Sequence, residues 1–150
     1  MIEQITNAEQ KREISRKILE ALHEWFELDE SRENYIAESS GWMFFAAKED
    51  DDYVGFLCLK KTGKRTVELA VMGVLKEYHR KGVGRALFEA ARETAVQEGY
   101  AFMQVKTVKM GVYEDYDITN RFYLSLGFEE FEVIEAVSYT HLTLPTMAVV

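Results

Sequence analysis

The N-terminal part of the chain has an apolar stripe at helical spacing. The apolar positions recur at steps of three and four residues, which predicts a helix from about Asn7 to Trp25. They are Ile14, Ile18, Leu22, Trp25 and Phe26. Ile2 to Ile5 predicts a short strand before this helix, and Thr6 and Glu9 have the spacing of a helix capping box. The stripe is expected to face the core.

The pattern then changes from helical to extended. Asp29 can cap a second short helix that runs through Ser39. Three apolar, aromatic-rich runs follow, with turn residues between them, and they predict an antiparallel meander. The runs are Trp42 to Lys48, Tyr53 to Lys60 and Thr66 to Val74.

Helical spacing returns after the meander. Gly82 to Glu98 has one apolar face, and Gly99 follows at a position typical of helix termination. Tyr100 to Thr107 then predicts another strand.

The remaining elements are a short helix and a strand. The helix is expected to begin at Asp117 or Thr119, to run to Leu126 and to end at Gly127. Phe128 to Ile134 predicts the last strand. The resulting order is β-α-α-β-β-β-α-β-α-β, which predicts an α+β fold.

Composition and charge place these elements in one globular domain. The chain has 150 residues, of which 47% are hydrophobic and 29% charged, as is usual for a folded domain. The net charge of -8 argues against a general affinity for nucleic acid or anionic membranes, because both require clustered Lys and Arg. A single cysteine and the absence of a membrane-length apolar run favour a cytoplasmic location. No metal is expected, because the three histidines form no ligand pattern.

The tail from Val137 to Thr146, VSYTHLTLPT, breaks the preceding pattern and contains the only proline. One permitted reverse translation resembles the transposase adapter used to prepare short-read sequencing libraries. We therefore expect a native domain over residues 1–136 and a non-native tail over 137–150. The alternative is a genuine irregular terminal strand. No functional residue is assigned beyond Ala136.

The strongest chemical signal lies between Val67 and Leu87. A strand there runs through a basic turn with Gly82 and Gly84 directly into a helix. The N–H groups and dipole of a helix start favour an anion, and glycine lets a phosphate approach the main chain. The alternative is a tight turn with a solvated basic face. A P-loop would need Ser or Thr after Gly-Lys, and a dinucleotide fingerprint would need a third glycine; neither is present.

Two motifs resemble signatures of the GNAT superfamily of N-acetyltransferases. EYHRKGVGRAL is similar to the family's coenzyme A pyrophosphate loop, in which Gln or Arg precedes two residues, Gly, one residue, and Gly or Ala. Gly82 and Gly84 match, and His79 stands where Gln or Arg is usual. NRFYLSLGFEEFE resembles the second signature, a Tyr followed four residues later by Gly-Phe. The resemblance covers nearly all of residues 1–136 and implies a mixed, mostly antiparallel sheet flanked by helices.

The resemblance also implies how acetyl-coenzyme A is held. Backbone groups of Met72, Gly73 and Val74 would pair with the pantetheine arm where the central strands separate, and an N–H near Gly73 or Val74 would hold the oxyanion. The pyrophosphate would lie on the loop that follows. The implied loop contacts are His79, Arg80, Lys81, Gly82, Val83, Gly84 and Arg85.

Further roles concern the last helix. Tyr123 falls on the family tyrosine, which can protonate the leaving thiolate. The alternative is a packed aromatic side chain. In many members an Asn lies two turns earlier; here that place is Tyr116, whereas Asn120 lies one turn before Tyr123. A cofactor contact by Asn120 is one of two open interpretations.

Acyl transfer also requires a group that takes a proton from the amine. Glu68 is the candidate base, because many relatives carry a carboxylate at this place in the strand that enters the loop. The alternative is a surface carboxylate on an edge of the meander. The segment Tyr113 to Asp117 has three carboxylates and two aromatic residues, a composition that can receive a cation. A solvated acidic loop is the alternative.

The sequence thus predicts direct transfer of an acetyl group from acetyl-coenzyme A to a primary amine of a small molecule, peptide or protein. The alternative from another class is a non-catalytic acyl-coenzyme-A-binding sensor or interaction module. Tyr123 distinguishes the two, because only catalysis requires its hydroxyl. The acceptor and the oligomeric state, including a homodimer, are left open.

Overall fold

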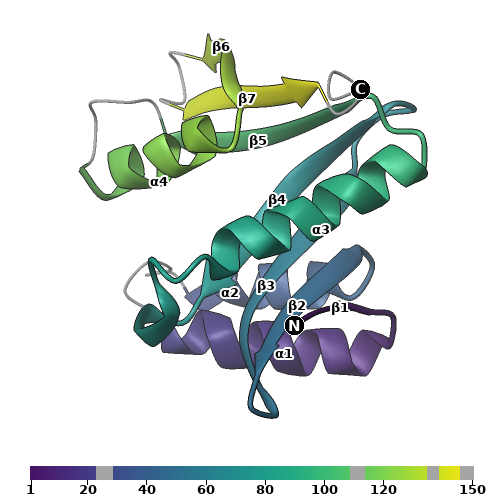
Figure 1. Cartoon of the computed structure of the whole chain (residues 1–150), viewed down its shortest axis with the longest axis vertical. Helices are drawn as coiled ribbons and strands as arrows, with labels where there is room; N and C mark the ends of the chain where they lie inside the picture. The colour runs from purple at the N-terminus through teal and green to yellow at the C-terminus, as the bar shows by residue number, and fades with distance from the viewer. Residues whose placement is uncertain (23–28, 109–113, 135–138, 146–150) are drawn as a thin grey trace. The chain divides into compact units, whose positions relative to one another are not determined.

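The computed structural model describes residues 1–22, 29–108, 114–134 and 139–145 (Figure 1). Within them the elements follow the predicted order, with a short 3-10 helix, η1, and a seventh strand added. They are β1 (Ile2–Ile5), α1 (Ala8–Ala21), α2 (Asp29–Ser39), β2 (Met43–Glu49), β3 (Asp52–Lys61), β4 (Thr66–Val74), η1 (Lys76–Tyr78), α3 (Val83–Gln97), β5 (Phe102–Val108), α4 (Glu114–Ser125), β6 (Glu129–Ile134) and β7 (Tyr139–Pro145).

The strands are hydrogen-bonded in the order β1-β2-β3-β4-β5-β7-β6. β4 and β5 are parallel, whereas β1–β2, β2–β3, β5–β7 and β6–β7 are antiparallel. This mixed, mostly antiparallel sheet with flanking helices confirms the predicted fold class. In the described part of the chain, no helix is both long and apolar enough to cross a membrane.

The chain divides into two units. Unit 1 comprises Met1–Lys60 and Ala70–Thr94, and unit 2 comprises Lys61–Leu69 and Ala95–Val150. β4 begins in unit 2 and ends in unit 1.

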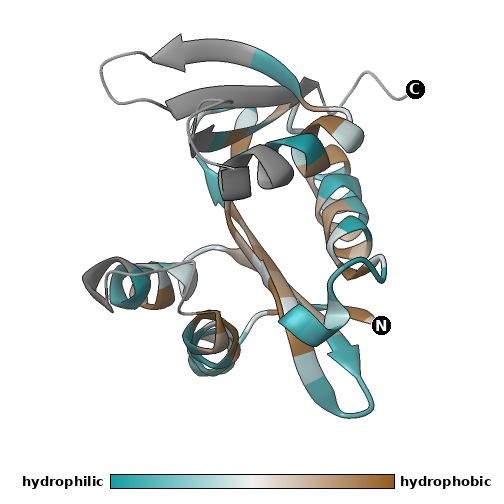
Figure 2. Ribbon diagram, turned by 90° about the vertical axis from the view of Figure 1, so that its left-hand side faces the viewer, coloured by the Kyte–Doolittle hydropathy of each residue, from teal (hydrophilic) through white to brown (hydrophobic). Residues whose placement is uncertain are grey.

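Helices cover both faces of the strands in unit 1. α1 and α2 lie against one face and α3 against the other (Figures 1 and 2). β3 is therefore buried on both sides, and its residues from Val54 to Leu59 form the continuous apolar run expected of a doubly covered strand. Phe56 and Cys58 belong to the core cluster on the α1 side. That cluster includes the predicted stripe residues Ile14, Ile18 and Leu22.

The start of α1 differs from the predicted capping box. Asn7, not Thr6, is the N-cap: its backbone is extended, and its side-chain oxygen accepts a hydrogen bond from the Gln10 N–H at 2.9 Å. Thr6 stands one residue too early, because the capping oxygen must come from the residue directly before the first helical one. The predicted positions Trp25 and Phe26 lie outside the described residues.

In unit 2, α4 begins earlier than predicted. It starts at Glu114, so that Asp117 and Thr119 lie within the helix and do not cap it. Acidic residues are favoured in the first turn because of the helix dipole, which explains why the segment expected as a loop is helical from Glu114. Tyr113 lies outside the described residues. Gly127, with φ +104°, ends α4 as predicted.

The tail contributes a strand. β7 pairs with β5 from Phe102 opposite Pro145 to Val108 opposite Tyr139, and it also pairs with β6. The structure therefore gives this segment a strand position between β5 and β6. The adapter interpretation concerns the gene and stays a prediction.

Candidate functional site

The predicted loop connects β4 to α3 within unit 1. The described pairing of β4 with β5 covers Thr66 to Glu68, whereas β4 itself continues to Val74. The N–H of Leu75, just beyond the strand, donates to the Val54 oxygen of β3 at 2.9 Å. Because successive strand residues turn their backbone groups to alternate edges, Val74 and Met72 face away from β3. Two of the three predicted pantetheine contacts thus have backbone groups at the edge opposite β3.

Gly73, the third of them, faces β3 and has a packing role that the motif did not reveal. A Cβ atom built at Gly73 would lie 3.1 Å from Ile18 Cγ2 and 3.3 Å from both Leu22 Cδ1 and Phe56 Cε1. These contacts are tighter than ordinary van der Waals contact, so a side chain at this position would push the neighbouring side chains of α1 and β3 apart by a few tenths of an ångström. The glycine at this position is explained by the core.

The His79 side chain forms a hydrogen bond with the protein's own main chain. Its Nε2 lies 2.7 Å from the Val74 oxygen, and its backbone N–H donates to the Lys76 oxygen at 3.1 Å. A carbonyl oxygen only accepts, so Nε2 is the donor. The ring therefore ties the start of the loop to the end of β4. The cofactor contact by His79 stays a prediction. The hydrogen bond from His79 to Val74, here called the His79 brace, was not predicted from the sequence.

The turn itself contains two residues in the left-handed region. Arg80 has φ +62° and Gly82 has φ +81°. A Cβ atom at Gly82 would meet nothing within 4 Å, so glycine is required there by the backbone angle, and the space beside it is open. The Ala86 N–H donates to the Gly82 oxygen at 3.0 Å, which starts the hydrogen bonding of α3. The amides of Val83 and Gly84 precede that bond and lie at the positive end of the helix dipole.

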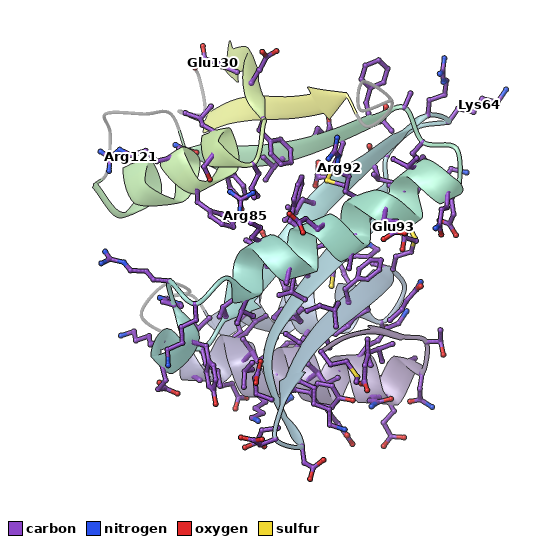
Figure 3. All side chains as sticks on the ribbon, viewed as in Figure 1. Lys64, Arg85, Arg92, Glu93, Arg121 and Glu130 are labelled. Atoms are coloured by element: carbon purple, nitrogen blue, oxygen red, sulfur yellow. The ribbon has the colours of Figure 1, made fainter. Side chains whose placement is uncertain are left out.

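Positive side chains surround this helix start. Arg80, Lys81 and Arg85 are exposed, and the first turn of α3 has no acidic residue. The Lys81 ammonium lies 5.5 Å from the centroid of the Tyr78 ring. Figure 3 shows Arg85 and Arg92 extending from the same side of α3. The combination of an open glycine, first-turn amides and three cations is suited to a phosphate group.

Tyr123 and Asn120 lie on α4 in unit 2. The Tyr123 side chain is 8% exposed, and its ring packs edge-on against Phe128, with centroids 5.8 Å apart. Asn120 is 2% exposed, which leaves little of it for a ligand to contact. Both the catalytic role of Tyr123 and the cofactor contact of Asn120 stay predictions.

Glu68 also lies in unit 2, and it is not a solvated carboxylate. Its side chain is 12% exposed. Its Oε1 accepts a hydrogen bond from Gln104 Nε2 at 3.2 Å and lies 3.3 Å from Lys106 Nζ. Neither partner was found from the sequence. No sequence signal identifies them, because it is the parallel register in the folded sheet that places Gln104 opposite Glu68.

The thiol of Cys58 is buried in unit 1. Burial raises the pKa of the Cys58 thiol, and the side chain is 0% exposed. A thiol in this state is neither ionised nor accessible, which argues against a nucleophilic role.

The chain matches the model of the acetyltransferase (GNAT) family over residues 5–128. A comparison with curated protein sequences gave no match. Among solved structures it is similar to the IAA acetyltransferase of Bacillus cereus, with a TM-score of 0.74 and 22% identity, covering 97% of this chain and 98% of that one. It is also similar to the paia N-acetyltransferase of Thermoplasma acidophilum in complex with coenzyme A (TM-score 0.70, 19% identity, 97% and 99% covered). A third is an aminoglycoside 6'-N-acetyltransferase complexed with coenzyme A (TM-score 0.77, 18% identity, 98% and 97% covered).

Proposed function

Because the chain belongs to the acetyltransferase (GNAT) family, we propose that it transfers an acetyl group from acetyl-coenzyme A directly to a primary amine. The observation that carries the proposal is the turn from His79 to Gly84, with Gly82 at φ +81° and open space beside it. Such a turn at a helix start binds the pyrophosphate through main-chain N–H groups. Arg80, Lys81 and Arg85 add the positive charge that this ligand requires.

The same part of unit 1 suits the pantetheine arm. Met72 and Val74 turn their backbone groups to the edge opposite β3, and His79 already holds the Val74 oxygen. The N–H of Val74 is therefore the better of the two predicted oxyanion donors, because Gly73 faces β3. In the proposed reaction this N–H stabilises the negative charge that forms on the thioester oxygen during attack.

Two side chains of unit 2 have the proposed proton-transfer roles. Glu68 takes a proton from the ammonium form of the acceptor, directly or through water, because only the neutral amine has a lone pair for attack. Tyr123 donates its hydroxyl proton to the departing thiolate. Attack forms the C–N bond and a tetrahedral intermediate, and the collapse of this intermediate breaks the C–S bond, so neither a covalent enzyme intermediate nor a metal is needed. Asn120 is kept as a proposed contact of the cosubstrate.

The acceptor is proposed to be a cationic amine. The net charge of -8 favours a positively charged partner in solution. One of the similar structures is named as an aminoglycoside acetyltransferase, so aminoglycosides are one class of acceptor to test, beside small amines and peptide amino groups. We propose no nucleic-acid partner on the same charge argument, a cytoplasmic location on the basis of the single cysteine, and a native domain of residues 1–136.

The direct experiment combines binding and turnover. Acetyl-coenzyme A binding is measured by calorimetry, and thiol release is then measured with kanamycin, a linear diamine and a short peptide with a free α-amino group. Binding with amine-dependent release supports the proposal. Binding without release for every amine favours the sensor module, and the absence of binding by a folded chain contradicts the assignment of the loop.

A further inference from the structure

One carboxylate in unit 2 is held by two side chains through a single oxygen. Glu68 on β4 faces Gln104 on β5 in the parallel register, and Lys106 lies two residues further along β5. Because side chains alternate along a strand, Gln104 and Lys106 project from the same face. Gln104 Nε2 and Lys106 Nζ both lie near Glu68 Oε1, at 3.2 Å and 3.3 Å.

The two carboxylate oxygens of Glu68 have different contacts. Oε1 accepts a hydrogen bond from Gln104 and forms an ion pair with Lys106, whereas Oε2 has no such contact with any side chain that the structure describes. The hydrogen bond and the ion pair both act at Oε1 and favour one orientation of the carboxylate, and the second oxygen keeps its lone pairs for another partner. Oε2 is thus the atom at which Glu68 can accept a proton.

We infer that Gln104 and Lys106 are positioning residues that aim Glu68 Oε2 at the acceptor amine. The inference rests on the proposed function, in which Glu68 is the base. In the step concerned, an N–H bond of the ammonium breaks, an O–H bond forms at Oε2 or through one water, and the freed electron pair stays on nitrogen. The proton later leaves Glu68 for solvent, which restores the carboxylate.

A structural role alone predicts something different. The Lys106 side chain is 46% exposed, and ion pairs with such exposed partners contribute little to stability because solvent screens them. If the pair only joined β4 to β5, its loss would leave the rate unchanged and lower the thermal stability slightly. If it positions the base, its loss lowers kcat while the affinity for acetyl-coenzyme A stays the same.

The test uses the full chain and the amine of the panel that gives the fastest thiol release. The variants are Lys106→Met, Lys106→Arg, Gln104→Met and Glu68→Gln, each alone, and Lys106→Met combined with Glu68→Gln. Lys64→Met is the matched control, since Lys64 is exposed on the β3–β4 hairpin and extends away from the ribbon (Figure 3). The measurements are kcat, KM for both substrates, and the Kd of acetyl-coenzyme A by calorimetry.

We expect Lys106→Met and Gln104→Met each to lower kcat by about three- to tenfold, the size of the net contribution of one ordinary hydrogen bond. The Kd of acetyl-coenzyme A should stay within about twofold of wild type, Lys106→Arg should recover most of kcat, and Lys64→Met should match wild type. In the Glu68→Gln background, Lys106→Met should have no further effect, because its action passes through the carboxylate.

Three results would overturn the inference at different levels. The positioning role is wrong if Lys106→Met and Gln104→Met keep the wild-type kcat. It is also wrong if Glu68→Gln is slow and Lys106→Met lowers its kcat by the same factor as it lowers that of wild type. Either result leaves Glu68 as the proposed base. Wild-type kcat for Glu68→Gln removes the base as well and leaves the transferase. A wild-type chain that binds acetyl-coenzyme A but acetylates no amine overturns the proposed function, and the inference with it.

Discussion

The Nε2 atom of His79 lies 2.7 Å from the main-chain oxygen of Val74, and this contact joins the loop to the end of β4. Val74 carries the proposed oxyanion N–H, and the residues after His79 form the proposed pyrophosphate loop. One side chain therefore fixes the distance between two parts of the proposed site that would contact different ends of the pantetheine-pyrophosphate chain.

Replacing His79 tests this brace. His79→Leu removes the donor and should weaken coenzyme A binding by about three- to tenfold, because a single hydrogen bond contributes about 1 kcal/mol. His79→Gln keeps an N–H donor of similar reach and should bind within about twofold of wild type. Calorimetric titration of both variants decides the matter. Equal affinities for wild type and His79→Leu would show that the brace has no role in binding.

Gly82 and Gly99 allow backbone strain to be separated from ligand binding. Both have positive φ, +81° and +87°, and a Cβ atom at either would meet nothing within 4 Å. Alanine at either position should therefore lower the free energy of unfolding by about 1 kcal/mol. Only Gly82→Ala should also weaken coenzyme A binding, since Gly99 lies at the other end of α3.

The pair is measured by urea unfolding and by calorimetry on the same preparations. Similar losses of stability with a loss of affinity confined to Gly82→Ala would support the assignment of the loop. A parallel loss of affinity in Gly99→Ala would attribute the effect to general destabilisation.

The elements predicted from hydrophobic spacing agree with the structure, because an element that is buried on one or both faces needs apolar residues at regular positions in the sequence. The Ile14–Ile18–Leu22 stripe and the doubly buried run of β3 are examples. The ends were less predictable. Asn7 replaces Thr6 as the N-cap, and α4 starts at Glu114, because several neighbouring residues could each cap a helix and their competition is decided by the surrounding chain.

For the candidate site, the sequence identified residue types but not their partners. The Gly82 turn was predictable, since a glycine pair directly before an amphipathic helix is typical of a turn with a left-handed backbone angle. The brace by His79 and the contacts of Glu68 with Gln104 and Lys106 depend on strand register and rotamers, which local sequence does not encode. The close packing at Gly73 likewise arises from the approach of α1, a distant element in the chain.

A bidentate ion pair between Arg16 and Glu33 joins α1 to α2, and it predicts a pH dependence of stability. Both guanidinium nitrogens lie 2.9 Å from carboxylate oxygens, and hydrogen bonding by Arg16 lowers the pKa of Glu33. A lowered folded-state pKa adds stability above the unfolded value of about 4.3, and this stability is lost as the pH falls through the folded value.

Glu33→Gln should therefore melt at a lower temperature than wild type at pH 7, and the difference should shrink progressively as the pH falls below about 4.3. The difference should be small and should shrink in high salt, because both side chains are about half exposed. Glu38→Gln on the same helix is the control. A difference between wild type and Glu33→Gln that persists at low pH would show that its origin is not the ion pair.

The tail gives a prediction about both the protein and its gene. β7 pairs with β5 and β6, so truncation after Ala136 would leave two strand edges unpaired and should cause self-association, visible by light scattering. We also expect amplification from source DNA to yield different codons after Ala136. Recovery of the same codons would contradict the adapter interpretation, and a monomeric, stable truncated chain would show that β7 is dispensable.

The most direct test of the account compares wild type with Tyr123→Phe. The ring contact with Phe128 survives this substitution, so folding and acetyl-coenzyme A affinity should be unchanged. If the hydroxyl protonates the thiolate, amine-dependent thiol release should fall by about tenfold or more. Equal affinity with this loss of rate is the predicted result. Equal rates for the two proteins, or no amine-dependent release by wild type despite binding, would contradict the proposed mechanism or the transferase function itself.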